Sequence, residues 1–325
     1  MSVKKRIFVT GAAGFIGSHL TEALLNRGDE VIGMDNFDPF YPEKIKRRNI
    51  KNIVSNPGFK FYEASILDIE KLKKVFQDNK ITHVVHLAAK AGVRPSITEP
   101  LLYQKTNVEG TGNILQVMRN FNVNKLIFAS SSSVYGNNKK VPFSESDNVD
   151  NPISPYAATK KAGELICYTY HHLFDLDIYA LRFFTVYGPR QRPEMAIYKF
   201  TRAIHSGVPI QVYGYGKPKR DYTYIDDIIQ GVLRSIDRVE GFEIINLGES
   251  QTILTNDLIS EIEKLLGKKA VRQDLPMQPG DVIQTYADVD KAKRILNYKP
   301  EISISTGLKK YIDWYRSEKE ILENV

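Results

Sequence analysis

The sequence predicts an α/β fold built on a doubly wound parallel sheet, with a smaller, discontinuous mixed α/β lobe beside it. Short runs of β-branched and aromatic residues alternate with helical stretches through the first half of the chain. These runs are almost continuously apolar, as expected for parallel strands that are covered on both faces. The size agrees, because 325 residues, 42% of them hydrophobic, can form one large domain and a smaller lobe.

The pattern changes after residue 184, where loop segments rich in Pro, Gly and Arg interrupt shorter elements. Residues 225–236 then have the pattern of a helix, residues 242–247 that of a strand, and the tail from about residue 251 is mainly helical. We therefore expect a main domain from residues 1–185 plus about 225–250, and a second lobe from about 186–224 plus 251–325. The early strands are expected at 6–10, 30–35, 59–64, 83–89, 125–131 and 177–183, and the early helices at 15–26, 68–79 and 101–121.

Composition excludes several classes of protein. The net charge is +7, with a basic run at 44–48, but the other basic residues are interleaved with acidic ones, so we expect no nucleic-acid partner. Cys167 is the only cysteine, which excludes an intramolecular disulfide and fits a reducing compartment. No run of 18 apolar residues and no signal-peptide core occur, so we expect a soluble cytoplasmic protein without a membrane partner.

A glycine-rich turn follows the first expected strand. Gly11, Gly14 and Gly17 open the next helix, and such glycines let the backbone approach a pyrophosphate at the helix N-terminus. Asp35 ends the second strand, where a carboxylate can accept from ribose hydroxyls and repels a 2′-phosphate. The alternatives are a tight strand-to-helix turn and a turn-forming aspartate before Asn36. Together the two signals predict a Rossmann domain that binds NAD rather than NADP.

A candidate catalytic group lies farther along. Tyr156 and Lys160 are four residues apart at the start of a helix that Ser154 and Pro155 should begin, so they share one face. An ammonium near a phenol lowers the phenol's pKa, which makes a usable base. Four serines, 130–133, follow the strand at 125–131, and strand C-termini are where ligands bind in such sheets. The spacing alone could arise by chance, and the serines could form a polar turn.

These motifs, with others along the chain, resemble extended short-chain dehydrogenases/reductases of the nucleotide-sugar epimerase and dehydratase group. The resemblance covers essentially the whole length and implies that Tyr156 takes the proton of the sugar 4-hydroxyl while hydride leaves C4. Lys160 would hold the nicotinamide ribose, and Ser131 would share a hydrogen bond with the substrate oxygen. The matching segments are 10–17, 86–89, 107–111, 130–136, 156–160, 220–227 and 279–281. The implied cofactor contacts are Gly11, Gly14, Phe15, Ile16, Gly17, Asp35, Asn36, Leu87, Ala88, Ala89, Asn107, Tyr156 and Lys160.

The residues after Ser131 separate three possible outcomes of a 4-keto intermediate. Related 4,6-dehydratases carry an acidic pair there, and related decarboxylases carry a glutamate at the second position. Here the two positions are Ser132 and Ser133. A hydroxyl is a poor substitute for a carboxyl acid or base near neutrality, so we expect C4 epimerisation of a UDP-sugar.

Three segments, 89–94, 182–195 and 277–282, resemble UDP-glucuronate 4-epimerases in particular. A uronate carboxylate needs hydroxyl donors and a guanidinium, and Ser132, Ser133, Thr185 and Arg192 are the matching candidates. Holding this carboxylate should also prevent loss of CO2 from the 4-keto uronic acid. The alternatives are surface pairing of Arg190 and Arg192 with Glu194, and a plain strand-end role for Thr185. Two departures from the subgroup or its relatives are Lys90, where a glutamine is usual, and Ser65, where many relatives have an aspartate.

The nucleotide of the substrate needs further contacts. Arg220 is the candidate for the diphosphate, with Asp221 or Asp226 as the alternative partners of its charge. Asp281 is expected at the uridine ribose. Arg94 could bind the pyrophosphate or only order its loop, and Gln211 with Tyr213 could border the uracil.

The histidines do not predict a metal site, since His171 and His172 are adjacent and no cluster has ligand spacing. The resemblance implies a homodimer formed through the helices near 101–121 and 156–174. The predicted function is thus NAD-dependent interconversion of UDP-glucuronate and UDP-galacturonate. The alternatives are a UDP-glucose or UDP-GlcNAc type 4-epimerase, a UDP-glucuronate decarboxylase or sugar 4,6-dehydratase, and a non-catalytic NAD sensor or scaffold.

Overall fold

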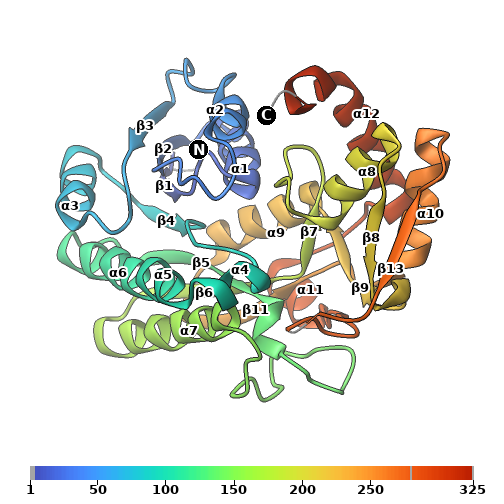
Figure 1. The fold of residues 1–325 in the computed structure, drawn as a ribbon. Helices are drawn as coiled ribbons and strands as arrows, with labels where there is room; N and C mark the ends of the chain where they lie inside the picture. The colour runs from blue at the N-terminus through green and yellow to red at the C-terminus, as the bar shows by residue number, and fades with distance from the viewer. Residues whose placement is uncertain (1–3, 279, 324–325) are drawn as a thin grey trace.

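A seven-stranded parallel sheet forms the centre of the computed structural model, which describes residues 4–278 and 280–323 (Figure 1). The strand order is β11-β6-β5-β4-β1-β2-β3, so the chain winds one way from β1 to β3 and the other way from β4 onward. The predicted doubly wound parallel sheet is therefore confirmed. Its strands are β1 (Arg6–Thr10), β2 (Glu30–Asp35), β3 (Phe59–Glu63), β4 (His83–His86), β5 (Lys125–Ser131), β6 (Asp177–Phe183) and β11 (Phe242–Leu247).

Alternating side chains of the strands explain why both faces of the sheet are covered. On β1, Ile7 and Val9 join one apolar cluster, whereas Phe8 between them joins the other. The first cluster includes the apolar faces of α1 and α9, and the second includes those of α3, α6 and α7. These helices are α1 (Phe15–Arg27), α3 (Ile69–Asp78), α6 (Gly110–Asn120), α7 (Pro155–Phe174) and α9 (Ile225–Arg238).

Two elements differ from the prediction near the site. The strand expected at 83–89 ends at His86, and residues 87–92 form a loop instead. The helix expected at 101–121 is divided into α5 (Pro100–Tyr103), a π-helical segment η1 (Gln104–Glu109) and α6. Within this segment the Asn107 amide hydrogen-bonds to the backbone of Lys90, which draws the helix toward the loop after β4.

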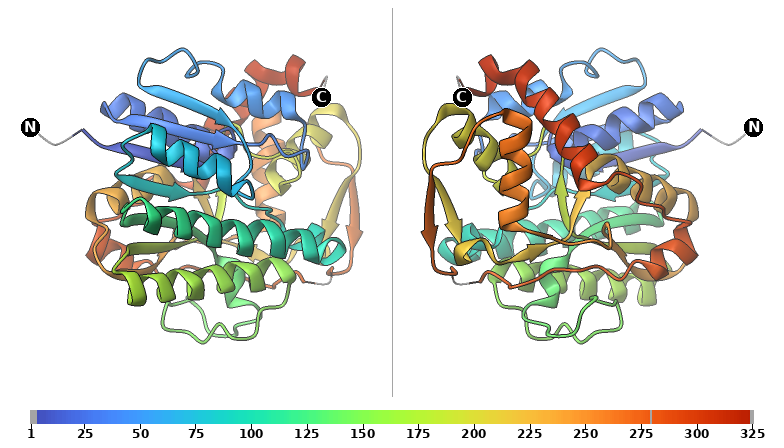
Figure 2. Two further views of the ribbon diagram at one scale, coloured as in Figure 1. Left: turned by 90° about the vertical axis from the view of Figure 1, so that its left-hand side faces the viewer. Right: turned by 90° about the vertical axis from the view of Figure 1, so that its right-hand side faces the viewer.

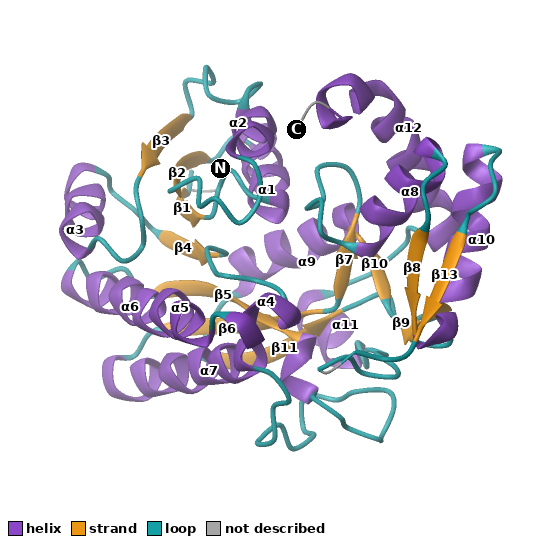
Figure 3. Cartoon of the chain, in the orientation of Figure 1, coloured by secondary structure: helices purple, strands orange, loops and turns teal. Residues whose placement is uncertain are grey.

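The second lobe lies beside the carboxyl ends of the strands (Figures 1 and 3). Its small sheets pair β8 with β13 and β7 with β10 in parallel, and β9 with β12 antiparallel. Leu258, Ile262 and Ile312 of this lobe belong to the same apolar cluster as Ile7 and Val9, so one core runs through both parts. The elements are β7 (Thr185–Tyr187), α8 (Ala196–Ser206), β8 (Ile210–Tyr213), β9 (Lys219–Arg220), β10 (Tyr222–Tyr224), β12 (Ile253–Leu254), α10 (Thr255–Leu266), β13 (Arg272–Leu275) and α12 (Ile304–Glu323).

One helix of the tail packs on the main sheet rather than on the lobe. α11 (Asp290–Leu296) contacts α9 and β11, although it lies within the segment 251–325. The exact division of the chain into two domains stays a prediction. Within the two described ranges, no helix combines the length and apolarity needed to cross a membrane.

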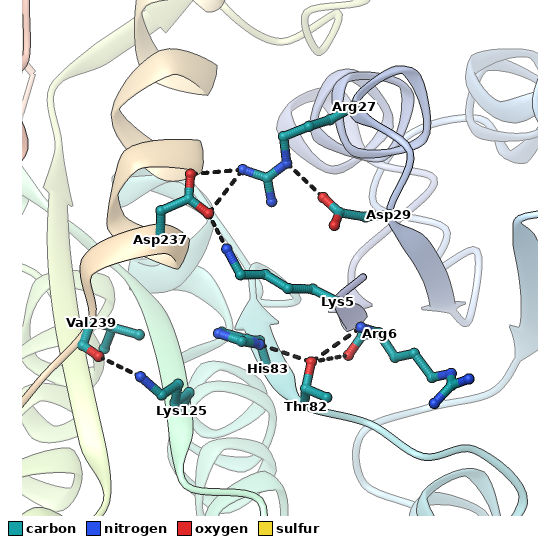
Figure 4. A network of polar contacts seen from close by, with 9 residues as sticks. All are labelled: Lys5, Arg6, Arg27, Asp29, Thr82, His83, Lys125, Asp237 and Val239. Atoms are coloured by element: carbon teal, nitrogen blue, oxygen red, sulfur yellow. Dashed lines mark hydrogen bonds and ion pairs between the residues drawn. The ribbon is translucent and has the colours of Figure 1, made fainter. Parts of the chain in front are cut away.

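The amino edge of the sheet is closed by a polar network (Figure 4). Arg27 of α1 bridges Asp29 at 2.6 Å and Asp237 of α9 at 3.0 Å, and Lys5 also pairs with Asp237. Next to it, the Thr82 hydroxyl accepts from the Arg6 backbone N–H at 3.1 Å and lies 2.9 Å from His83 Nδ1. These contacts attach α9 to α1 and to the residue before β1, on the side of the sheet away from the site.

The basic run at 44–48 lies on α2 (Glu43–Ile50), and three of its four cations contact groups of the same molecule. Lys46 donates to the Asp38 carbonyl at 2.7 Å, Arg47 pairs with Glu43 at 2.5 Å, and Arg48 pairs with Glu318. Such internal pairing accounts for part of the positive charge without a polyanionic partner.

Candidate active site

A cavity of about 470 Å³ opens at the carboxyl ends of β1, β4 and β5, where the strand order reverses. This is the position at which doubly wound sheets bind their ligands. Most of the residues predicted from the sequence line it together. They are Gly11, Gly14, Phe15, Ile16, Gly17, Asp35, Asn36, Leu87, Ala88, Ala89, Ser131, Ser132, Ser133, Tyr156, Lys160, Thr185 and Arg192.

The turn between β1 and α1 has the shape of a phosphate cradle. A Cβ added to Gly17 would lie 2.0 Å from the Gly11 carbonyl oxygen, and one added to Gly11 would lie 2.9 Å from the Ala88 nitrogen. Gly11 also has φ +71°, which favours glycine. Among the described residues no side chain caps the start of α1, and the first turn of this helix contains no acid. The turn and the start of this helix therefore fit the pyrophosphate of a dinucleotide.

Asp35 is fixed beside this turn. Its carboxylate accepts from the Ala13 N–H at 3.1 Å and the Phe37 N–H at 2.9 Å. Burial raises the pKa of Asp35, and the nearby Lys46 charge and the two N–H groups oppose that rise. Each oxygen retains capacity to accept from a ribose hydroxyl. The position thus fits the adenosine ribose of NAD.

α7 presents Tyr156 and Lys160 to the cavity, one turn apart. The Ser154 side chain caps this helix by accepting from the Ala157 N–H, and Pro155 follows it, as the sequence predicted. Lys160 is buried and donates to the Ala129 carbonyl oxygen at 2.7 Å. Burial lowers the pKa of Lys160 to about 8, against the opposing influence of Cys167 and Glu164.

The phenol of Tyr156 is buried beside groups that influence its pKa. Burial raises the pKa of its phenol, and the groups that lower this pKa are a hydrogen bond with Ser131 and the charge of Arg192. The Lys160 ammonium donates to the Ala129 carbonyl, and its effect on the Tyr156 pKa stays a prediction. Ser131 and Arg192 therefore favour the phenolate form of Tyr156.

Three hydroxyl residues and a guanidinium line the cavity next to the tyrosine. Ser132 and Ser133 begin the 3₁₀ turn η2 (Ser132–Tyr135), and the Ser133 N–H donates to Ser131 Oγ at 3.1 Å. Thr185 begins β7. Arg192 pairs with Glu194 at 2.8 Å, so the pairing considered as an alternative is present, yet the side chain still lines the cavity.

The other predicted substrate residues form a second cluster, outside the lining of this cavity. Its members are Arg94, Gln211, Tyr213, Arg220 and Asp281. The guanidinium of Arg94 lies 2.8 Å from Asp281 and 4.6 Å from the centre of the Tyr213 ring, whose hydroxyl donates to Gln211 at 2.8 Å. Burial lowers the pKa of Arg220, and both Arg94 and Asp281 influence it. The cluster joins the cavity through Val93, at the start of α4 (Val93–Thr98). Pro279 of the predicted motif is outside the described residues.

Asn107 lies behind the cavity wall rather than on its surface. Its amide accepts from the Lys90 N–H at 2.8 Å and donates to the Lys90 carbonyl at 2.9 Å and the Thr159 hydroxyl at 3.0 Å. Lys90 itself lines the cavity and pairs with Asp38 at 2.7 Å. The contact of Asn107 with the cofactor stays a prediction, because in the structure the Asn107 side chain binds the backbone of Lys90 behind the cavity wall.

Sequence reasoning missed part of the wall. Phe40, Tyr41 and Lys46 line the cavity from the segment after β2. Tyr41 is buried, and its hydroxyl has no hydrogen-bond partner within the described residues. A signal existed, because a loop that follows the ribose-binding strand must pass beside the cofactor. Ser65 also lines the cavity, and its hydroxyl accepts from the Leu67 N–H at 3.2 Å.

In the described part of the chain no three His, Cys, Asp or Glu side chains are grouped as metal ligands. The fold and the site together define a dinucleotide-binding enzyme with a Tyr–Lys–Ser centre. Residues 7–248 match the NAD dependent epimerase/dehydratase family. The chain belongs to this family.

Individual relatives are more specific. The chain is 45% identical to a UDP-glucuronate 4-epimerase of Thermodesulfobacterium geofontis, over 98% of each chain. Its structure is similar to that of UDP-glucuronic acid 4-epimerase from Bacillus cereus in complex with UDP-glucuronic acid and NAD. The TM-score is 0.91 at 40% identity, covering 96% of this chain and 99% of the other. A UDP-glucose 4-epimerase of Thermotoga maritima gives a TM-score of 0.88 at 33% identity, covering 97% and 99%.

Proposed function

We propose that this protein is an NAD-dependent isomerase that interconverts UDP-glucuronate and UDP-galacturonate through a 4-keto intermediate. One observation carries the choice among related reactions. Ser132 and Ser133 follow Ser131 and line the cavity together with Tyr156 and Arg192. Neither of these two serine positions has a carboxyl group. These side chains suit retention of a uronate carboxylate, and the two serine positions lack an acid for dehydration or decarboxylation.

Bound NAD supplies the hydride acceptor and then the hydride donor for the sugar C4. Tyr156 removes the 4-hydroxyl proton during oxidation and returns it after the keto sugar has turned its other face. Ser131 stabilises the phenolate by its hydrogen bond, and the Arg192 charge favours the same form. Lys160, on the same helical face one turn later, holds the nicotinamide ribose. The phosphate cradle at Gly11–Gly17 and Asp35 hold the other half of the dinucleotide.

Arg192 and the hydroxyls of Ser132, Ser133 and Thr185 bind the uronate carboxylate. A bidentate guanidinium contact keeps that carboxylate near the ring plane, where the bond to CO2 is poorly aligned for cleavage. The second cluster, from Arg94 to Asp281, takes the UDP moiety. Arg94 and Arg220 provide positive charge for the diphosphate, while the Tyr213 ring offers an aromatic edge to uracil.

The first experiment is incubation of the purified protein with UDP-glucuronate without added NAD, followed by chromatography and mass analysis. We expect UDP-galacturonate, at unchanged mass, from cofactor that remains bound. A Tyr156→Phe variant should lose about 10²–10⁴-fold in kcat while keeping its fold and bound NAD, because only the proton transfer is removed. A product lighter by CO2 would overturn the role of Arg192 and the serines. Turnover of UDP-glucose alone would overturn the uronate assignment.

We also propose that the enzyme is a homodimer in the cytoplasm. α6 and α7 lie side by side on one face of the molecule (Figure 2, left). Leu165 and Tyr168 of α7 and Leu101 of α5, which contacts α7, are exposed apolar side chains. A second copy would bury them. Leu165→Glu should yield a monomer by light scattering, whereas Val208→Glu, at an exposed site outside this face, should leave the dimer intact. Cys167 is free and buried, which fits a reducing compartment.

A further inference from the structure

A continuous chain of hydrogen bonds crosses the carboxyl edge of the sheet beneath the cavity. The Ala88 N–H donates to Thr10 Oγ1 at 3.1 Å, and that oxygen lies 2.7 Å from His86 Nδ1. On the other side of the ring, His86 Nε2 lies 3.1 Å from Thr111 Oγ1. The Thr111 hydroxyl donates to the Asn107 carbonyl at 2.6 Å. Thr10, His86 and Thr111 are all buried and serve no step of the proposed chemistry.

The chemistry of the groups involved determines which atom donates in each of these hydrogen bonds. A carbonyl only accepts, so the single hydrogen of the Thr111 hydroxyl points to Asn107, and Thr111 Oγ1 must accept from His86 Nε2–H. Burial and then the nearby Lys160 charge lower the pKa of His86 to about 3, so the ring is neutral and has one hydrogen. Nδ1 is therefore an acceptor, and the Thr10 hydroxyl donates to it.

The two ends of this series of hydrogen bonds lie at two different parts of the site. Ala88 lines the cavity and packs against Gly11 of the phosphate cradle. At the other end, the Asn107 side chain binds the Lys90 backbone and the Thr159 hydroxyl, which itself donates to the Tyr156 carbonyl at 2.8 Å. The bonds thus connect the cofactor wall formed by β4 and its loop with the first turn of α7.

We propose that His86, held as the neutral Nε2–H tautomer, is a positioning residue that sets the placement of the cofactor wall relative to Tyr156. A protonated or reversed imidazole would present two donors to two hydroxyls, or would place a donor against Thr10, whose own hydrogen would then lack an acceptor. The wall at Ala88–Lys90 would move relative to α7. Because hydride leaves C4 for the nicotinamide while the 4-hydroxyl proton passes to Tyr156, the cofactor and the tyrosine must be placed together, and such a displacement slows chemistry more than it weakens sugar binding.

The test compares two substitutions at one position. Thr111→Val keeps the shape of the side chain but removes both the acceptor for His86 and the donor to Asn107, whereas Thr111→Ser keeps them. Ser235→Ala is the matched control, since Ser235 is a buried helical hydroxyl in α9 that donates to the Gly231 carbonyl four residues earlier, as Thr111 does to Asn107. Thr10→Val breaks the chain at the opposite side of the ring and serves if Thr111→Val does not fold.

We expect Thr111→Val to lower kcat on UDP-glucuronate by roughly 10- to 100-fold with little change in KM, and to release bound NAD faster. Thr111→Ser and Ser235→Ala should retain activity and NAD. In the wild type, imidazole ¹⁵N shifts of His86 should show the Nε2–H form, unchanged from about pH 5 to 8. The proposal is overturned by an Nδ1–H form, by a Thr111→Val variant that behaves like Ser235→Ala, or by equal losses in Thr111→Val and Thr111→Ser.

The kinetic part of this inference rests on the proposed epimerase function, whereas the tautomer and NAD retention do not. If the wild type fails to convert UDP-glucuronate but His86 shows the Nε2–H form and Thr111→Val loses NAD, the substrate is wrong and the positioning role stands. If conversion occurs and the NMR result is the opposite tautomer, the function stands and the positioning role is wrong.

Discussion

The two ends of β4 show how one strand serves two unlike edges of the sheet. His83, at the amino end, belongs to a rim of ion pairs that includes Lys5, Arg27 and Asp237 (Figure 4). His86, three residues later, is buried between the hydroxyls of Thr10 and Thr111 and forms no ion pair with the residues that the structure describes. Burial lowers the pKa of His83 to about 4 and that of His86 to about 3.

The difference reflects what each edge must do. Exposed ion pairs tolerate variation in geometry and contribute little energy, which is sufficient where the sheet only meets solvent. Next to a cavity that accepts phosphates and a carboxylate, a mobile charge would compete with the ligand. Neutral hydrogen bonds with fixed donors place the wall without adding such a charge.

The largest expected effect on folding comes from a fully buried ion pair near the carboxyl edge. Glu164 of α7 receives hydrogen bonds from Arg182 at 2.8 and 2.9 Å and from Ser130 at 2.6 Å, and both ions of the pair are about 1% exposed. Glu164→Gln leaves the buried guanidinium uncompensated, so we expect a loss of about 3–5 kcal/mol in the free energy of unfolding, measured by urea denaturation.

Removing both charges gives the control for this pair. Glu164→Leu combined with Arg182→Met should recover much of the stability lost in Glu164→Gln, since an apolar pair of similar volume avoids the cost of an isolated buried charge. A single variant as stable as the wild type would contradict the view that this pair holds α7 against β5 and β6.

An intermediate effect is expected at the amino edge in acid. Because the folded pKa of His83 is lowered, the unfolded chain binds more protons between about pH 6.5 and 4, and stability falls as the pH falls through that window. In that window His83→Gln should reduce the slope of the unfolding free energy against pH, by up to the amount that corresponds to about one proton bound on unfolding. Measurement by denaturant titration at several pH values checks this, and an unchanged slope would mean that His83 is charged in the folded protein.

The smallest effect is expected for the rim itself. Asp237 is 44% exposed, and its pairs with Lys5 and Arg27 are screened by solvent. Asp237→Asn should change the free energy of unfolding by less than about 1 kcal/mol and leave kcat unchanged. A larger loss, or one that affects turnover, would contradict the separation of the two edges.

The site residues that could be predicted from the sequence are those that belong to motifs with a fixed local spacing. Gly11, Gly14 and Gly17 follow a strand directly, and Tyr156 and Lys160 are one helical turn apart, so both sets could be assigned to strand ends or a helix start before any tertiary contact was known. The doubly wound sheet followed from the apolar runs, because parallel strands buried on both faces leave that pattern.

Contacts between distant segments left no such pattern. The partner of Lys160 is the backbone carbonyl of Ala129, and Arg190 pairs with Glu22 far away in sequence. Backbone groups give no residue-specific signal, and an arginine on a loop can meet any of several acids. The π-helical turn at Asn107 likewise depends on a loop after β4 that must first be folded.

One apolar cluster is shared by both lobes, so the stability of the second lobe depends on that of the first. Leu258 and Ile312 pack within the same cluster as Ile7, so this part of the interior is common to both lobes and couples their unfolding. Heat should therefore unfold the enzyme in one cooperative transition. A ligand held only by the glycine turn and Asp35 would then protect α10 and α12 from proteolysis without touching them.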